Sequence, residues 1–390
     1  MGAEAEVFDY PAVDVAAPKR QHVLLTADTL GGVWTYALEL SRALLARGHR
    51  VTLATMGRLP DARQRREAAS VSGLDMHSRA YRLLWMEDAW ADVAAAGEWL
   101  LGLAARVKPT VVHLNDLGHG ALAWNLPVLT VGHSCVLSWW RAVHGQSAPA
   151  SWDVYRRHVR KSLSASDMVV APTSWMMREL RARYAPFASH RVIANGRSDE
   201  ICGARLKAPL VFSAGRIWDE AKNIGALATA ARRIEWPIYV AGSQEHPDGR
   251  SVAMESVRLL GSLAEAAVLR WFARASIYAL PARYEPFGLS ALEAAHARCA
   301  LVLGDIPSLR EIWGDAACFV PPDDPDALVR ALQRLIRDED LRAEYGELAQ
   351  RRARRYTPAA MAMAYEEAYS QIVEAHLAFH LHGLRSWSRP

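Results

Sequence analysis

The chain has 390 residues, more than one compact core usually fills, which predicts at least two domains. Hydrophobic residues make up 51% of the sequence and charged residues 23%, a balance that excludes a disordered chain. The formal net charge of +4 is too small to indicate a nucleic-acid-binding protein, and the sequence lacks a run of about 18 uncharged apolar residues, which excludes a transmembrane helix.

The N-terminal segment 1–20 carries acidic residues and lacks the apolar core of a signal peptide, so we expect a loose leader there. The chain has four cysteines, and no two of them have the C-x-x-C spacing of a zinc site or a redox pair. So few cysteines fit a reducing compartment. We therefore expect a cytoplasmic protein.

In the first half of the chain, short apolar runs alternate with longer segments whose apolar residues recur at helical spacing. The strand-like runs are 22–26, 51–54, 111–114, 128–131 and 168–171. The helix-like segments are 35–47, 90–107 and 152–164. This alternation predicts a parallel sheet whose strands are joined by crossover helices.

The second half repeats the pattern and is large enough for a doubly wound α/β domain of its own. Its strand-like runs are 210–214, 238–241, 257–260, 276–279, 301–303 and 318–320. Its helix-like segments are 223–234, 264–275, 289–297, 324–337 and 341–354, and a last helix is predicted over 357–383. The change of domain is expected near 192–203, where a strand ends at Asn195-Gly196 and a polar stretch follows.

Gly31 and Gly32 lie between the first predicted strand and the first predicted helix. Paired glycines let a ligand approach the backbone closely, and the amides that open the helix would face an anion. A tight turn without a ligand is the alternative. The spacing is not G-x-G-x-x-G, which argues against a nicotinamide cofactor.

Arg216 and Lys222 follow the strand that ends near Gly215. Ligands of open α/β sheets bind at the carboxyl ends of strands, so these two cations could clamp a diphosphate. The alternative is a pair of solvated surface cations.

The strongest motif contains two glutamates, Glu285 in a loop at a strand end and Glu293 in the first turns of the next helix. The amides of Phe287, Gly288 and Leu289 open that helix and form an anion cradle. Carboxylates accept hydrogen bonds from pairs of hydroxyls, so one glutamate could hold a ribose and the other a hexose. Singly, each could be a solvated acid; together, in a Pro-Phe-Gly-Leu frame, they favour a ligand site.

These motifs, with the stretches 192–196 and 305–311, resemble family 4 of the glycosyltransferases, which are retaining nucleotide-sugar enzymes. The resemblance spans nearly the whole chain. It implies the GT-B fold, an α/β architecture in which two Rossmann-like doubly wound domains face each other across a cleft. It assigns residues 1–195 to an acceptor domain and 196–364 to a donor domain. It also implies that a C-terminal helix, about 365–390, packs back on the first domain.

The resemblance implies a role for each motif. Arg216 and Lys222 would hold the donor diphosphate and stabilise it as a leaving group in place of a metal ion. Glu293 would bind the ribose hydroxyls, and Glu285 the transferred sugar beside the amides of 287–289. Gly31 and Gly32 would reach across the cleft toward the donor.

Three residues of the first half match family positions near the reacting groups. His133 matches a histidine near the transferred sugar, and His113 and Asp116 match a strand-end pair near the acceptor. A hydrogen-bonded strand-end residue is the alternative for each. The donor would be a UDP- or GDP-hexose, with no metal and no other cofactor.

The sequence departs from the family after the second glutamate, where Ala297-Arg298-Cys299-Ala300 replaces the usual glycine and proline. We expect this change to remove a tight turn at the helix end and to affect donor choice.

The expected partners are a nucleotide sugar and a carbohydrate or lipid-linked acceptor, without nucleic acid. The basic segment 156–161, which follows Trp139 and Trp140, adds a hypothesis of peripheral contact with the inner membrane face; a solvated helix face is the alternative. Two other functions stay open, a sugar-nucleotide epimerase of the same fold and a non-catalytic nucleotide-sugar-binding protein. A silent binding protein would be expected to lack Arg216, Lys222 or Glu293.

Overall fold

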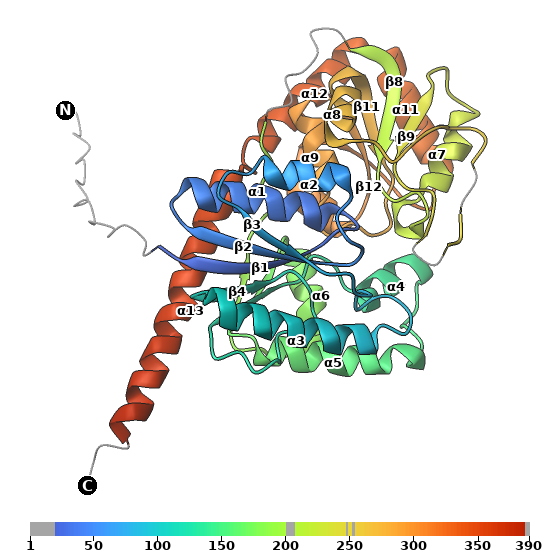
Figure 1. The fold of residues 1–390 in the computed structure, drawn as a ribbon. Helices are drawn as coiled ribbons and strands as arrows, with labels where there is room; N and C mark the ends of the chain where they lie inside the picture. The colour runs from blue at the N-terminus through green and yellow to red at the C-terminus, as the bar shows by residue number, and fades with distance from the viewer. Residues whose placement is uncertain (1–19, 200–206, 247–248, 252–253, 387–390) are drawn as a thin grey trace, which may run out of the picture.

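The computed structural model describes residues 20–199, 207–246, 249–251 and 254–386. They form two parallel β-sheets, each enclosed by helices (Figure 1). A cleft lies between the two halves. The leader predicted at 1–20 lies almost entirely outside the described residues. Among the helices of the described part, none combines the length and the apolar run that a bilayer crossing needs.

The first sheet has seven parallel strands in the order β3-β2-β1-β4-β5-β6-β7. The strands are β1 (His22–Asp28), β2 (Arg50–Met56), β3 (Asp75–Ser78), β4 (Val111–Leu114), β5 (Val128–Val131), β6 (Met168–Ala171) and β7 (His190–Val192). Alternate side chains of β1 enter different cores, Val23 and Leu25 toward one face and Leu24 toward the other. Burial on both faces explains why this strand is apolar without interruption.

Six α-helices cross over between these strands. They are α1 (Gly32–Ala46), α2 (Ala62–Ala69), α3 (Trp90–Val107), α4 (Val136–His144), α5 (Asp153–Ala165) and α6 (Ser174–Tyr184). Apolar residues of α1 pack on one face of the sheet, and those of α3 pack on the other. The chain order reverses between β1 and β4, so the carboxyl ends of these strands form the switch point where α/β sheets bind ligands.

The second sheet has six parallel strands in the order β10-β9-β8-β11-β12-β13, with its switch point between β8 and β11. The strands are β8 (Ala208–Ala214), β9 (Ile238–Ala241), β10 (Arg258–Gly261), β11 (Ala275–Leu280), β12 (Ala300–Gly304) and β13 (Cys318–Val320). The helices are α7 (Ile224–Ala231), α8 (Glu265–Arg274), α9 (Leu289–His296), α10 (Pro307–Trp313), α11 (Pro325–Arg337) and α12 (Glu339–Ala353), and a 3-10 turn, η2, spans Glu220–Lys222.

The last helix, α13 (Pro358–Ser386), leaves the second domain and packs against the first, and its far end extends beyond the body of the molecule (Figure 1). Tyr365 and Tyr369 are fully buried in the same core as α1. Gly196 lies where the helix begins, and a Cβ there would fall 2.2 Å from the carbonyl oxygen of Thr357. The close approach of these two chain segments therefore requires glycine at this position of the linker, the segment that follows β7 and leads to the second sheet.

An ion cluster fixes α13 on the first domain. Glu366 accepts a hydrogen bond from Nη2 of Arg47 at 2.7 Å and lies 2.7 Å from Nε2 of His49. The backbone N–H of Gln21 donates to Nδ1 of His49 at 3.0 Å, so the ring proton is on Nε2 and points at the carboxylate. Burial raises the pKa of Glu366, but the hydrogen bonds from Arg47 and His49 outweigh burial and hold the pKa below its ordinary value.

We expected the sequence Ala297-Arg298-Cys299-Ala300 to remove the tight turn at the end of α9. The turn is present, so that prediction is wrong. Arg298 follows the end of α9 with φ of 59°, the left-handed conformation that a glycine usually takes there. Its side-chain Nε donates to Oε1 of Gln350 at 2.8 Å. A residue other than glycine can occupy this region at a cost of about 1 kcal/mol, which the packed helix end tolerates.

We predict that Glu366→Gln lowers the free energy of unfolding by about 2 kcal/mol, because hydrogen bonds to a charged acceptor contribute about that much. The folded-state pKa of Glu366 is depressed, so its contribution is fully present above the ordinary value of 4.5 and is lost as the pH falls through the folded-state pKa. Urea titrations of both proteins should differ at pH 7 and converge at acid pH. A difference that does not change with pH would contradict the assignment.

Candidate functional site

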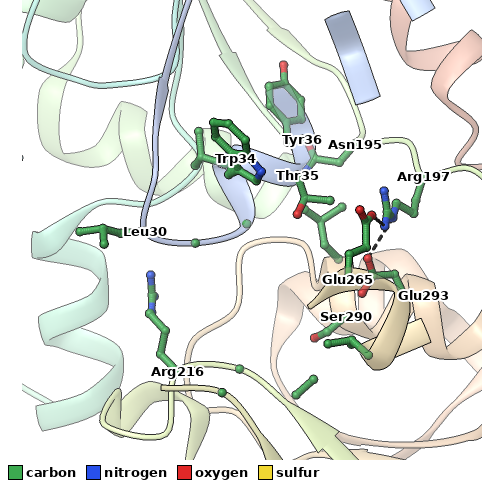
Figure 2. Close-up of a pocket in the computed structure, with 18 of the residues that line it drawn as sticks. Leu30, Trp34, Thr35, Tyr36, Asn195, Arg197, Arg216, Glu265, Ser290 and Glu293 are labelled. Atoms are coloured by element: carbon green, nitrogen blue, oxygen red, sulfur yellow. Dashed lines mark hydrogen bonds and ion pairs between the residues drawn. The ribbon is translucent and has the colours of Figure 1, made fainter. Parts of the chain in front are cut away.

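The cleft between the two domains has a volume of about 680 Å³ and is lined by residues that follow strands of both sheets. From the first domain come the loop after β1, helix α1 and the residues after β5; from the second come the loops after β8, β10 and β11. Figure 2 shows the loop at Leu30 on one side and Arg216 pointing toward it from the other. The cleft thus joins the switch points of both sheets.

The glycine loop after β1 touches the second domain. A Cβ on Gly31 would lie 3.4 Å from Nη1 of Arg216, and a Cβ on Gly32 would lie 3.4 Å from Cδ1 of Leu289. The backbone N–H of Leu30 donates to Oδ1 of Asp28 at 2.8 Å, which fixes the start of the loop. Any side chain at Gly31 would enter the space in front of Arg216.

Arg216 lies just beyond the carboxyl end of β8. Its Nη2 donates to Oδ2 of Asp219 at 2.7 Å, and its guanidinium lies 5.2 Å from the centre of the Trp218 ring. Asp219 also accepts a hydrogen bond from Nε1 of Trp139, on α4 of the first domain, at 3.0 Å. The side chain of Arg216 is 41% exposed, so its guanidinium still faces the cleft although it is hydrogen-bonded to Asp219.

Lys222 and Glu285 form an ion pair in the same part of the cleft, and both side chains are mostly buried. Oε1 of Glu285 accepts a hydrogen bond from the backbone N–H of Gly288 at 3.0 Å. Gly288 has φ of 90°, which turns the chain directly into α9. The carboxylate therefore connects an ammonium group to the N-terminus of a helix, two features that each favour an anion.

Glu293 is held by a residue that the sequence analysis did not identify. Arg197 in the linker donates from Nε to Oε1 of Glu293 at 2.9 Å and from Nη1 to Oε1 of Glu39 at 2.6 Å, and it also pairs with Glu265. Figure 2 shows Arg197, Glu265 and Glu293 side by side. Glu39 belongs to α1, whereas Glu265 and Glu293 begin α8 and lie in α9, so this cation joins the two domains.

Burial and the neighbouring charges shift the pKa values of two members of this cluster, Arg197 and Glu293. Only 5% of the Arg197 side chain is exposed; burial lowers its pKa, but the three carboxylates raise it above its ordinary value. Burial raises the pKa of Glu293, and Arg197 offsets only part of that rise. Sequence offers little signal for this cluster, because its members come from four separate elements.

The three predicted residues of the first domain occupy different places. His133 lines the cleft, with Nε2 2.8 Å from Oδ1 of Asn115 and its ring 4.4 Å from that of Tyr36. His113 is fully buried behind it, with Nδ1 2.6 Å from the hydroxyl of Tyr369. Oδ1 of Asp116 lies 2.6 Å from Nδ1 of His119, with which it forms a hydrogen bond. Of the three, only His133 is among the residues that line the cleft.

Two further contacts hold the domains together beside the glutamate loop. The Tyr284 hydroxyl accepts from the backbone N–H of Cys135 at 3.1 Å and lies 2.9 Å from Oγ of Ser138, at the start of α4. The Glu311 carboxylate accepts from the first amides of α6, those of Ser174 at 2.6 Å and Trp175 at 2.9 Å. The first contact holds the loop that carries Glu285 against the first domain, and the second holds α10 against it.

In the part of the chain that the structure describes, no three His, Cys, Asp or Glu side chains are grouped so that they could hold a metal ion. The charged groups that the cleft presents are Arg42, Arg58, Arg63, Arg197, Arg216, Lys222, Glu39, Glu67, Asp219, Glu265, Glu285 and Glu293.

Two family profiles together match most of the chain. One, described as Glycosyltransferase Family 4, matches residues 30–200, and one described as Glycosyl transferases group 1 matches residues 208–338. The first range contains the glycine loop, and the second contains Arg216, Lys222, Glu285 and Glu293.

Two curated relatives illustrate the similarity. Glycogen synthase of Mycobacterium tuberculosis (strain H37Rv) is 27% identical over 374 residues, which cover 83% of this chain and 85% of that protein. Phosphatidyl-myo-inositol mannosyltransferase of Mycolicibacterium smegmatis is 31% identical over 157 residues, or 37% of this chain. This second match spans 41% of the mannosyltransferase's length.

Among solved structures, Anabaena HepE in complex with UDP-glucose superposes with a TM-score of 0.73 at 15% identity, over 90% of this chain and 100% of that chain. At this identity the likeness shows the fold, two parallel α/β domains about a cleft. The profiles, the relatives and the architecture agree: the chain belongs to the family 4 glycosyltransferases and has their GT-B fold.

Proposed function

We propose that the protein transfers a hexosyl unit from a nucleoside-diphosphate sugar to an acceptor hydroxyl, with retention at the anomeric carbon. One observation carries the proposal: Lys222 and Arg216 face the cleft beyond the end of β8, beside the N-terminus of α9. Two cations and a helix N-terminus in one place suit a diphosphate, which develops negative charge as it leaves.

The geometry suggests how the diphosphate enters. Glu285 neutralises Lys222 and accepts from the amide of Gly288, so it occupies both groups that the proposal assigns to phosphate. A diphosphate would exchange with this carboxylate as the partner of Lys222. Glu285 would then be available to hydroxyls of the transferred sugar, which are hydrogen-bond donors.

The other cleft residues complete the assignment. Oε1 of Glu293 accepts from Arg197, and we assign Oε2 to the ribose hydroxyls. Gly31 and Gly32 would admit the phosphates next to Arg216. The acceptor hydroxyl would attack from the face that the leaving group occupies, with a donor phosphate oxygen taking its proton, so no protein nucleophile is required.

We propose a UDP- or GDP-hexose as the donor and a glycan or lipid-linked hydroxyl as the acceptor. Support comes from the presence of UDP-glucose in the HepE complex and from relatives named for glycogen and for phosphatidyl-inositol. For a lipid-linked acceptor, Arg157, Arg160 and Lys161 on α5 offer exposed positive charge to the inner membrane face. The indole N–H of Trp139 donates a hydrogen bond to Asp219 at the cleft, so Trp139 does not belong to the basic surface on α5.

We predict that Lys222→Ala lowers the rate at which the enzyme converts its nucleotide sugar to UDP or GDP about 10²–10³-fold. One positioned hydrogen-bond donor at a developing negative charge contributes that much. The donor is first found by thermal shift with a panel of UDP- and GDP-hexoses. Arg330→Ala, which removes a cation from the exposed face of α11, is the control and should retain the wild-type rate. Equal rates in both variants would remove Lys222 from the diphosphate site.

Glu293→Gln should weaken the binding of UDP or GDP about tenfold, the loss expected when a carboxylate that holds two hydroxyls becomes an amide. Isothermal titration calorimetry measures this directly. Glu347→Gln, on the exposed surface of α12, serves as the control. An unchanged dissociation constant in Glu293→Gln would rule out the ribose assignment.

Treatment with a chelator should leave turnover unchanged, because the proposal assigns leaving-group stabilisation to Arg216, Lys222 and the amides of α9. Turnover is measured before and after dialysis against EDTA, and again after Mg²⁺ or Mn²⁺ is added. Loss of turnover that a metal restores would contradict the cation-only assignment.

A further inference from the structure

We infer that Asn115 is a positioning residue that keeps the ring proton of His133 on Nε2, so that Nδ1 accepts a hydrogen bond from a substrate hydroxyl in the cleft. The inference rests on the proposed function, since it concerns how one residue of that site meets its substrate. It is argued from the hydrogen bonds of Asn115 behind His133, at the switch point of the first sheet.

The orientation of the Asn115 amide is set by β1. Nδ2 of Asn115 donates to the backbone carbonyl of Thr26 at 2.7 Å, and a carbonyl can only accept. The backbone N–H of Asn115 donates to Oγ1 of Thr26 at 2.8 Å, which holds the main chain in register. The NH₂ group therefore faces β1, and the amide oxygen faces the two histidines.

That oxygen determines both tautomers. Oδ1 of Asn115 lies 2.8 Å from Nε2 of His133 and 3.1 Å from Nε2 of His113. An amide oxygen only accepts, so both Nε2 atoms carry protons, and in a neutral ring Nδ1 is then an acceptor. The partner of His113 agrees, because its Nδ1 is 2.6 Å from the Tyr369 hydroxyl, which donates.

Both rings are neutral at physiological pH. Burial lowers the pKa of His133 to about 3, and burial with the neighbouring His133 lowers that of His113 to about 3. Burial also raises the pKa values of the tyrosines packed around them, Tyr36 on α1 and Tyr365 and Tyr369 on α13. The charged residues of the second domain that line the same cleft are Arg216, Asp219, Lys222, Glu265, Glu285 and Glu293.

The arrangement gives His133 one task toward the cleft. With Nε2 engaged by Asn115, Nδ1 is the nitrogen that remains for a ligand, and it offers a lone pair. His133 thus accepts from a hydroxyl and does not donate a proton to the leaving group. A substrate that lacks this hydroxyl would leave the lone pair without a donor, which makes the pair Asn115–His133 a determinant of specificity.

The tautomer is read by long-range ¹H–¹⁵N NMR of the full chain labelled with ¹⁵N-histidine, with His133 assigned from the spectrum of His133→Gln. At pH 7 the inference predicts a protonated Nε2 and an unprotonated Nδ1. A proton on Nδ1 would overturn it. Because the spectrum needs no turnover, this failure is separate from a failure of the proposed transferase activity.

Variants test the cause. Asn115→Leu should mix the tautomers of His133 and lower kcat/KM about 10- to 100-fold, as for groups that hold a histidine ring from behind. Tyr369→Phe, the control, removes the hydrogen bond to His113 and should keep both the tautomer and the rate. A folded Asn115→Leu protein with the wild-type tautomer and rate would contradict the inference.

If Asn115→Leu does not fold, Asn115→Asp tests the same inference through the pH dependence of kcat/KM. A carboxylate beside the ring raises the pKa of His133, so Nδ1 gains a proton as the pH falls through that new pKa and can no longer accept. The ratio of variant to wild-type kcat/KM should therefore fall from pH 8 to pH 6. A ratio that is constant over this range would overturn the inference.

Discussion

The ion pair between Lys222 and Glu285 is the interaction on which the cleft depends. It keeps an ammonium group, a carboxylate and the N-terminus of α9 together at the carboxyl end of the second sheet, where each mostly buried charge has a partner. In the proposed function, these three groups bind a nucleoside-diphosphate sugar. A donor phosphate would then replace the carboxylate as the partner of Lys222, and Glu285 would turn toward the sugar.

The two domains are coupled through charge as well as through packing. Arg197 takes one carboxylate from the first domain and two from the second, so the geometry of the cleft and the state of Glu293 depend on the same linker residue. Removing a buried cation that has three acidic partners leaves their repulsion uncompensated. Helix α13 adds a second connection, since it begins beside Gly196 and places Tyr369 against His113.

The sequence predicted the architecture well and the cleft in part. Apolar runs marked both central strands, β1 and β8, and the glycine and glutamate motifs fell beside the switch points because parallel sheets bring carboxyl ends to one edge. The short, half-exposed strand β3 gave no clear alternation and was missed, whereas β7 was predicted only as a strand that ends near Asn195. Arg197 and Asn115 were also missed, because their partners lie in distant elements and no local spacing encodes them. The roles assigned to the cleft residues stay predictions.

The central claim is that Arg216, Lys222 and the first amides of α9 bind the donor diphosphate. A crystal structure of the protein with UDP or GDP, whichever binds, tests it most directly. The account predicts phosphate oxygens within about 3 Å of the Lys222 ammonium and the Arg216 guanidinium, with Glu285 displaced from Lys222. A nucleotide bound away from both cations, with the Lys222–Glu285 pair intact, would contradict it.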